Sequence, residues 1–284
     1  MPLLVAHAAS LLLATLDIAA RAWRYVLLLR GLRATLSLRG ALVLTVFGDA
    51  VAAITPMRLG GEPARVLGAR HDGVPVGRAV VALALENLLT YAILIPAAAV
   101  VATRYGEDWW HTIAPHFDVG LLQWLVIATV VAAVVGVFVG WRRMRATRGD
   151  LTTRGEGFRQ LVADLLSFPI WLLLRCIILS GISLVARVSI LPVLASAAPN
   201  PPSLGVLTVA SLGLLYGQLF VPTPSGAGPI DVAVLAGATG VSSRAPALLG
   251  AWRLYTTILP IVAGLAAGFI AYGRAILSLL PRRD

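Results

Sequence analysis

The chain has 284 residues, of which 58% are hydrophobic and 13% charged, and its mean hydropathy is +0.87. A soluble domain carries about 25% charged residues, so the composition excludes an ordinary soluble globule. The formal net charge is +10, and arginine supplies all of the Lys+Arg total. These arginines separate apolar stretches, as orientation signals and lipid-headgroup contacts do. Nucleic acid is therefore not expected as a partner.

Five apolar stretches are long enough to cross a membrane as helices, which takes about 20 residues each. They are Leu3 to Ala20, Ala79 to Thr103, Gly120 to Trp141, Leu165 to Ala195 and Ala245 to Tyr272. No arginine precedes the first stretch, so we interpret it as a span and not as a signal peptide. The pattern predicts an all-α polytopic membrane protein with one transmembrane domain over residues 1–284 and five or more full spans.

Two shorter apolar stretches, Ala41 to Thr55 and Leu204 to Val221, are interrupted and follow a common plan. Each runs into a turn rich in proline and glycine, then an acid, then a stretch of small residues and a span with a proline in its middle. The corresponding positions are Pro56, Glu62, 64–69 and Pro96 in the first, and Pro224, Asp231, 232–241 and Pro260 in the second. Paired interruptions indicate broken or re-entrant helices in a transporter built from repeats. Chance is the alternative, because membrane helices are rich in glycine and proline.

Arginine placement predicts the topology. Arginines are dense in 21–39, which includes Arg21 and Arg24, and again in 142–159, so both segments are predicted to be cytoplasmic. Segments 104–119 and 196–203 have almost none and are predicted to lie outside, where Arg244 is the exception. These assignments are mutually consistent only if the two interrupted stretches are hairpins, the first entering the membrane from the cytoplasm and the second from outside. The result is an inverted repeat with halves of about 1–141 and 160–284, the N-terminus outside and the C-terminus cytoplasmic.

The hairpin tips predict an internal polar chamber, because irregular backbone at membrane depth must be buried in protein or line a water-filled cavity. Pro63 and Pro229 are predicted to open helices whose N-termini face this chamber and suit a phosphate group. Arg58 and Arg65 are expected to add phosphate contacts. A structural alternative stays open, in which Asp231 satisfies helix amides and Glu62 pairs with Arg65 at i,i+3.

Ionisable residues also lie inside the apolar stretches, where they are functional candidates. Glu86 lies about seven residues, near 10 Å, into its span, so we expect it to need an arginine or a proton as partner. Asp49 is a similar candidate, and Arg187 either snorkels to the interface or faces inward. Arg253, with Tyr255, is expected to face the chamber opposite the second tip. The candidate substrate-binding residues are Arg58, Gly60, Gly61, Glu62, Arg65, Glu86, Asn87, Pro224, Ser225, Gly226, Gly228, Asp231 and Arg253.

Glycines spaced four residues apart predict close helix packing. The pairs are Gly136/Gly140, Gly213/Gly217 and Gly264/Gly268. The lone Cys176 excludes an intramolecular disulfide, and no metal site or cofactor is expected.

The tip motifs resemble a known family. Pro56, Gly60-Gly61-Glu62 and Arg65, together with Glu86-Asn87 and the later Pro222-Thr-Pro224-Ser-Gly226-Ala-Gly228, are similar to the flippase-like membrane proteins related to the transmembrane domain of lysylphosphatidylglycerol synthases. The second motif differs from the family pattern, because Ser225 replaces a glycine and Asp231 stands for a glutamate. The resemblance covers roughly residues 20–275. It implies movement of a lipid or lipid-linked headgroup between leaflets, with aminoacylated phosphatidylglycerol as one class of cargo.

The leading hypothesis is therefore a lipid flippase or transporter of the cytoplasmic (inner) membrane, not an enzyme, with anionic or aminoacylated phospholipids as partners. A homo-oligomer stays open. One alternative is an intramembrane lipid-phosphate hydrolase, which needs paired acids and a basic phosphate clamp, but the sequence has no Glu-x-x-x-Glu spacing and no Ser-Arg-Ser tip. Separately, Ser225 in its glycine-rich turn is a weak candidate nucleophile, for which no His or Asp partner is evident. Another alternative is a membrane scaffold that transports nothing.

Overall fold

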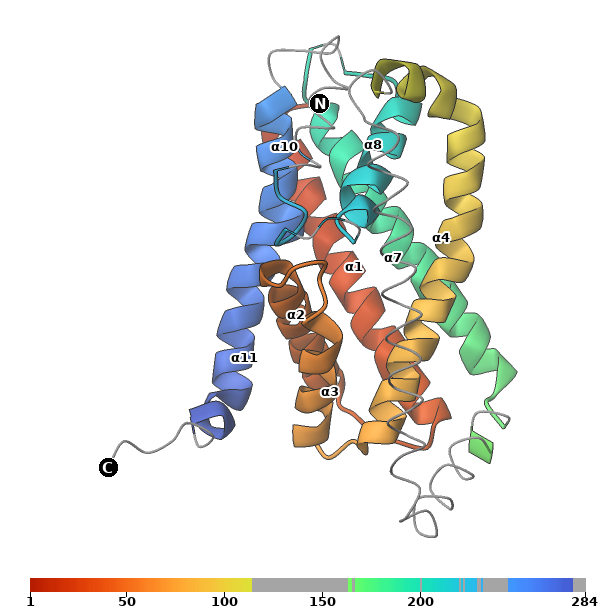
Figure 1. Cartoon of the computed structure of the whole chain (residues 1–284), viewed down its shortest axis with the longest axis vertical. Coiled ribbons are helices and arrows are strands. Elements are labelled where there is room, and N and C mark those ends of the chain that lie inside the picture. The colour runs from red at the N-terminus through yellow and green to blue at the C-terminus, as the bar shows by residue number, and fades with distance from the viewer. Residues whose placement is uncertain are drawn as a thin grey trace.

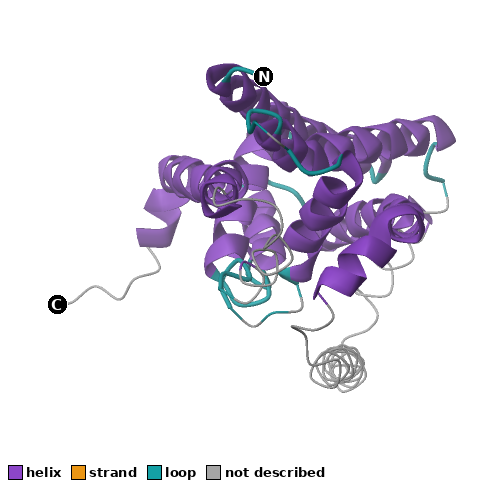
Figure 2. Ribbon diagram, turned by 90° about the horizontal axis from the view of Figure 1, so that it is seen from above, coloured by secondary structure: helices purple, strands orange, loops and turns teal. Residues whose placement is uncertain are grey.

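The computed structural model describes residues 1–113, 163–164, 167–199, 201–219, 221, 223–228, 231 and 245–277. Throughout these residues the regular structure is helical, as the all-α expectation requires (Figures 1 and 2). The predicted span Gly120 to Trp141, the small-residue stretch 232–241, Pro229, Gly136/Gly140 and the arginines of 142–159 lie outside the described residues.

Four helices of the described chain are long and apolar enough to cross a membrane. They are α1 (Leu3–Gly31), α4 (Val76–Ile113), α7 (Ile170–Ala195) and a continuous run formed by α10 (Ala245–Arg253), the π-helical segment η3 (Leu254–Ile258) and α11 (Leu259–Leu277). They match four of the five predicted spans. In Figure 1 they run through most of the height of the molecule.

Helix α1 continues eleven residues beyond Ala20, the predicted end of the first span. The predicted end of the first span, Ala20, was therefore too early. Arg21 and Arg24 lie within the helix, and their charges are neutralised by carboxylates on neighbouring helices. Helix α7 begins at Ile170, five residues after Leu165, the predicted start of its span. Pro169 precedes it as the N-cap residue, where a missing N–H has no consequence.

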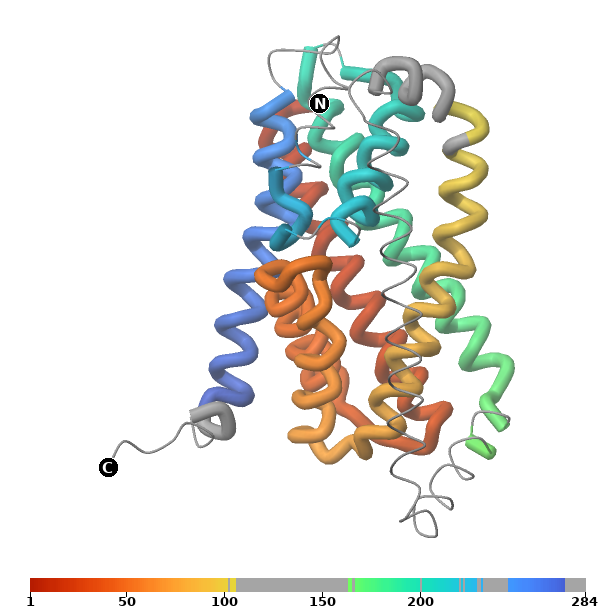
Figure 3. Tube along the Cα trace, in the orientation of Figure 1, coloured from red at the N-terminus to blue at the C-terminus, as the bar shows by residue number. Residues whose placement is uncertain are grey.

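Two helices between the first two spans form the predicted hairpin. Helix α2 (Leu38–Ile54) starts at the N-cap Ser37, and α3 (Gly61–His71) returns to the same end of the molecule (Figure 1). With 17 and 11 residues they measure about 25 and 17 Å, shorter than the roughly 30 Å of a membrane core. They occupy the lower half of the view in Figure 3.

Helix α8 (Leu204–Gly217) lies in the opposite half of the molecule and ends at mid-height, close to the tip of the first hairpin (Figure 3). Its N-cap is Ser203, whose side chain accepts a hydrogen bond from the amide of Val206. The segment 223–228 follows it and supplies the second tip. The described residues thus contain one complete hairpin and the first arm of another.

The two predicted mid-helix prolines have different consequences. Pro96 is accommodated within α4. Pro260 comes two residues after η3, the stretch where the last long helix adopts π-helical bonding. Proline has no N–H to give to the carbonyl four residues earlier, and a π-bulge is a common response to such a break.

Apolar side chains form two separate clusters in the described chain. The lower cluster joins the C-terminal half of α1 to α2, α3, α4 and the start of α7, and the upper one joins the end of α7 to α8 and α10. Between the two clusters, the apolar faces of α1 and α7 are interrupted by buried polar side chains. These are Asp17 and Arg24 on α1 and Ser180 and Ser183 on α7. A polar layer therefore crosses the middle of the bundle.

Close packing by glycine is confirmed for one predicted pair. A Cβ on Gly264 would lie 2.1 Å from the carbonyl oxygen of Val46, and one on Gly268 would lie 2.2 Å from the ring of Phe47. Helix α11 can therefore approach α2 closely. For Gly213, a Cβ would meet no atom of the described residues within 4 Å, so close packing is not seen there.

Candidate functional site

The first tip connects α2 to α3 through residues 55–60. Met57 and Arg58 both have positive φ, 51° and 60°. The amide of Arg58 donates to the carbonyl of Thr55, and the amide of Leu59 donates to that of Pro56. Positive φ at two consecutive non-glycine residues is unfavourable, so tertiary contacts must hold this turn.

The second tip repeats the backbone conformation of the first. Ser225 and Gly226 have φ values of 53° and 63°, and the amides of Gly226 and Ala227 donate to the carbonyls of Thr223 and Pro224. Gly228 also has positive φ, at 93°. The equivalence that the sequence proposed between Pro56 and Pro224 therefore holds for the local turn geometry.

The two tips touch each other. Pro56 and Pro224 form an antiparallel bridge, and the buried hydroxyl of Ser225 donates to the carbonyl of Ala53 at 2.8 Å. Arg58 on the first tip donates to Oε1 of Gln218 at 3.3 Å. The hydroxyl of Ser225 is thus engaged by the backbone of α2.

A small polar cavity of about 30 Å³ lies where the tips meet the long helices. Among the described residues, three arginines and two aspartates line it: Arg21, Arg58, Arg187, Asp17 and Asp49. Gln218, Tyr255, Thr256 and Pro260 also contribute to its wall. Its volume suits one or two water molecules, so this conformation is closed to any lipid headgroup.

Ion pairs connect the charged side chains that line this cavity. Both terminal nitrogens of Arg21 donate to Asp49, at 2.9 and 2.5 Å, and one is also 3.2 Å from Asp17. Asp17 accepts two further bonds from Arg187, at 3.0 and 2.7 Å, and one from Ser183. Asp17 is the midpoint of α1, with 14 helical residues on either side, so the pairs lie near the centre of the span.

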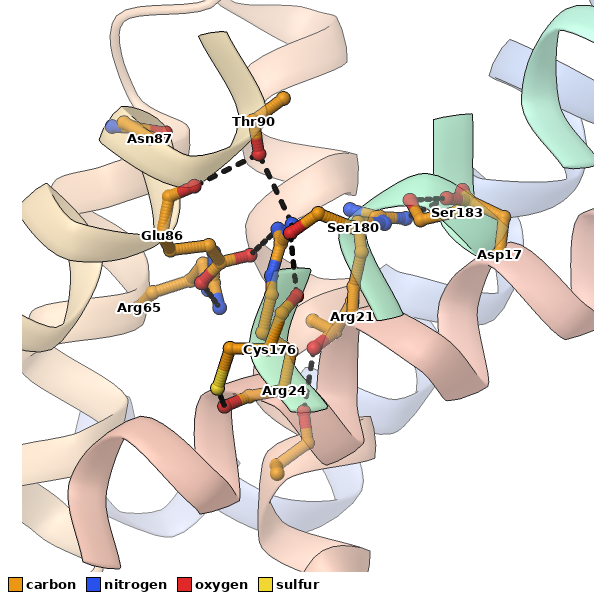
Figure 4. A network of polar contacts seen from close by, with 12 residues as sticks. Asp17, Arg21, Arg24, Arg65, Glu86, Asn87, Thr90, Cys176, Ser180 and Ser183 are labelled. Atoms are coloured by element: carbon orange, nitrogen blue, oxygen red, sulfur yellow. Dashed lines mark hydrogen bonds and ion pairs between the residues drawn. The ribbon is translucent and has the colours of Figure 1, made fainter. Parts of the chain in front are cut away.

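A second network surrounds Glu86, which lies on α4 (Figure 4). Its two carboxylate oxygens accept from Arg24 at 2.8 Å and from Arg65 at 2.7 Å. Arg24 also donates to Thr90 and Ser180, and its side chain is only 3% exposed. The guanidinium of Arg65 stacks 4.7 Å from the ring centroid of Tyr25. The prediction that Glu86 needs an arginine partner is confirmed.

The acids of both tips are held by the following long helix. Asn87 on α4 donates to Glu62, which is exposed, and Arg253 on α10 donates to Asp231 through two nitrogens. Arg253 also donates to the carbonyl of Ser225. Arg253 was expected to face the chamber opposite the second tip; it binds the second tip itself and is not among the described residues that line the cavity. The expected pair of Glu62 with Arg65 was wrong, because the Arg65 side chain reaches Glu86 instead.

Other site expectations need smaller corrections. Helix α3 begins at Gly61 after the N-cap Gly60, so Pro63 is its third residue and not its first. Both glycines and Glu62 are at the N-terminus of α3 as expected. Arg187 does not snorkel away from the protein, because Asp17 binds it.

Asp17 and Gln218 are polar residues of the cavity wall that sequence reasoning missed. Asp17 is the clearer case, since an aspartate in the middle of an apolar span, four residues before Arg21, is itself a signal. Gln218 was visible as the polar residue after Gly217. Tyr255, which was expected to face the chamber, does line the cavity. Its hydrogen bond to His7 on α1, at 2.8 Å, is a contact that the sequence gives no means to foresee.

Comparison with known proteins identifies the family. A family model described as "Lysylphosphatidylglycerol synthase TM region" matches residues 2–264. The chain belongs to this family. The resemblance predicted from the tip motifs is therefore confirmed, and membership together with the apolar helices supports an integral membrane protein related to lipids. No curated protein and no solved structure matches the chain.

Proposed function

We propose that the protein moves a phospholipid or lipid-linked headgroup between the leaflets of the cytoplasmic membrane. The observation that carries this proposal is the ion-paired cavity at the middle of the bundle, closed by two touching tips that arrive from opposite halves of the molecule. Charged groups inside a membrane usually belong to a substrate or ion pathway. A polar headgroup that crosses the hydrocarbon core needs such a layer of replaceable polar contacts.

An inverted repeat underlies this proposal. The equal turn geometry of the two tips supports it, as does the way in which each tip acid, Glu62 or Asp231, is held by the next long helix. In such transporters, one repeat moves against the other and exposes the central site to each side in turn. Arginines gather at the end of the bundle where α1 stops and α2 starts, and we assign this end to the cytoplasm.

Transport can be tested with purified protein in liposomes that contain a tail-labelled fluorescent phospholipid. Dithionite added outside bleaches label in the outer leaflet, so transport across the bilayer increases the bleached fraction beyond about one half. We expect faster loss of protected fluorescence with wild-type protein than in empty liposomes. The Arg253→Gln variant, which frees Asp231 at the second tip, should be slower.

The matched control is Arg175→Gln. Arg175 also lies within a membrane-spanning helix, but its side chain is exposed and stacks on Trp171, away from the cavity. Wild-type rates are expected for this variant. If the wild-type protein moves no phospholipid under any applied gradient, the proposed function is wrong, and the scaffold alternative becomes the better explanation.

A further inference from the structure

The charges that line the central cavity do not balance. Within the described part of the wall, three arginines face two aspartates, so the cavity carries one excess positive charge. Arg21 makes two bonds to Asp49 and a contact with Asp17, and Arg187 makes two bonds to Asp17, so these two arginines take up both carboxylates. The excess charge therefore resides on Arg58.

Arg58 has the longest polar contacts of the three arginines. Its nitrogens lie 3.3 Å from Gln218 Oε1 and 4.0 Å from Asp49, against 2.5–3.0 Å for the hydrogen bonds that hold the other two. Its side chain is only 18% exposed. A half-buried guanidinium whose polar contacts are long and whose best partner is a neutral amide is poorly compensated. It has donor capacity for an anion.

The backbone beneath Arg58 adds a second observation. Arg58 has a φ of 60° and occupies the turn position that Gly226 fills in the other tip. Glycine suits this conformation, whereas an arginine there is strained. Strain of this kind persists where the side chain has a task at the site.

Gln218 is arranged as a temporary partner for Arg58. Its amide nitrogen donates to the carbonyl of Leu215 at 2.6 Å, which turns its oxygen toward the guanidinium of Arg58. The contact joins the first tip to the end of α8. A phosphate oxygen is a stronger acceptor than an amide oxygen, so a phosphate on Arg58 displaces Gln218 and loosens one of the links between the tips.

We propose that Arg58 binds the phosphodiester of the transported lipid, and that the passage selects headgroups with a net negative charge over cationic, aminoacylated ones. This inference rests on the proposed transport function and adds its substrate class. An anionic headgroup neutralises the excess charge, a zwitterionic one leaves it, and a headgroup with a net positive charge increases it. The carboxylates of the wall offer such a cation little, because Arg21 and Arg187 already occupy them.

The test compares three tail-labelled lipids with identical acyl chains in the liposome assay: phosphatidylglycerol, phosphatidylcholine and lysylphosphatidylglycerol. We expect the anionic lipid to move roughly tenfold faster than the cationic one, because bringing like charges together in a desolvated site is strongly unfavourable. Arg58→Gln should remove this preference. Arg58→Lys should keep part of it, since it retains the charge but loses the planar fork.

Two controls separate binding from folding. Arg175→Gln should leave the preference unchanged, and each variant should elute as a single species at the wild-type position in size-exclusion chromatography. Native mass spectrometry of protein incubated with equal amounts of the three lipids gives an independent reading. Wild-type protein should retain phosphatidylglycerol, and Arg58→Gln should lose it.

The outcomes distinguish this inference from the function on which it rests. If lysylphosphatidylglycerol moves as fast as phosphatidylglycerol or faster, transport stands and the charge selection is overturned. Selection that survives in Arg58→Gln overturns the role of Arg58. If no lipid moves, the proposed function fails, and retention of the three lipids with equal abundance would overturn the anion site as well.

Discussion

Glu86 neutralises two buried arginines at once, Arg24 and Arg65, which come from different helices. Glu86→Gln removes the negative charge but keeps the shape of the side chain. We expect a loss of about 3 kcal/mol or more in the free energy of unfolding, because breaking a buried pair leaves uncompensated charge. Thermal unfolding in detergent checks this. The control is Glu62→Gln, whose carboxylate is exposed and should matter by only about 0.5 kcal/mol; equal effects of the two changes would contradict the argument.

Asp17 and Arg187 offer a double-mutant cycle inside the cavity. Asp17→Asn alone leaves Arg187 without its carboxylate and should destabilise the fold. Arg187→Gln alone leaves Asp17 with Arg21 and Ser183, so it should cost less. With both changes, the stability should recover by about 1–3 kcal/mol relative to the sum of the single effects, as for residues in direct contact. Additive losses in chemical unfolding would show that the two residues act separately.

Sequence reasoning was least successful in finding the partners of individual buried charges. The density of arginines in 21–39 led to a first span that ends at Ala20, but Arg21 and Arg24 lie inside the helix. Their partners, Asp49 and Glu86, lie 28 and 62 positions away. A single sequence shows that a buried charge needs a counterion without showing which one it has. The same limit produced the local, incorrect pairing of Glu62 with Arg65.

At the scale of elements, the approach of α11 to α2 depends on Gly264. In an exposed helix, replacing glycine with alanine stabilises by roughly 0.5–1 kcal/mol. At Gly264 the new Cβ would lie 2.1 Å from a backbone oxygen of α2, so the helices must separate and the sign should reverse. Gly250→Ala is the matched control, because a Cβ there meets nothing within 4 Å on the same continuous helix. We expect a lower melting temperature for Gly264→Ala only, together with faster amide exchange in α2.

Elements were predictable to the extent that hydropathy and turn residues define them. Long apolar runs gave four spans, and the proline and glycine clusters located both tips. Boundaries were less accurate where tertiary contacts decide them. Helix α1 extends past Ala20 because carboxylates on other helices stabilise its arginines.

At the scale of the whole molecule, the polar layer separates two apolar clusters, and the tips close it from both sides. The cavity of about 30 Å³ has room for one or two water molecules but not for a headgroup. The proposed transport therefore requires the tips to part. The contacts between them that would have to break are the bridge of Pro56 with Pro224, the bond of Ser225 to Ala53 and the bond of Arg58 to Gln218.

A disulfide between the tips should hold the passage shut. Proline has no N–H, so Pro56 and Pro224 must form a non-hydrogen-bonded antiparallel pair, in which the Cα atoms are about 4.5 Å apart. That distance lies within the range that a disulfide spans. In a Cys176→Ala background, Pro56→Cys with Pro224→Cys should crosslink on mild oxidation and stop lipid movement, and reduction should restore it. Each single cysteine variant, treated in the same way, should respond to neither reagent. Transport that continues in fully crosslinked protein would mean that the lipid path does not run between the tips.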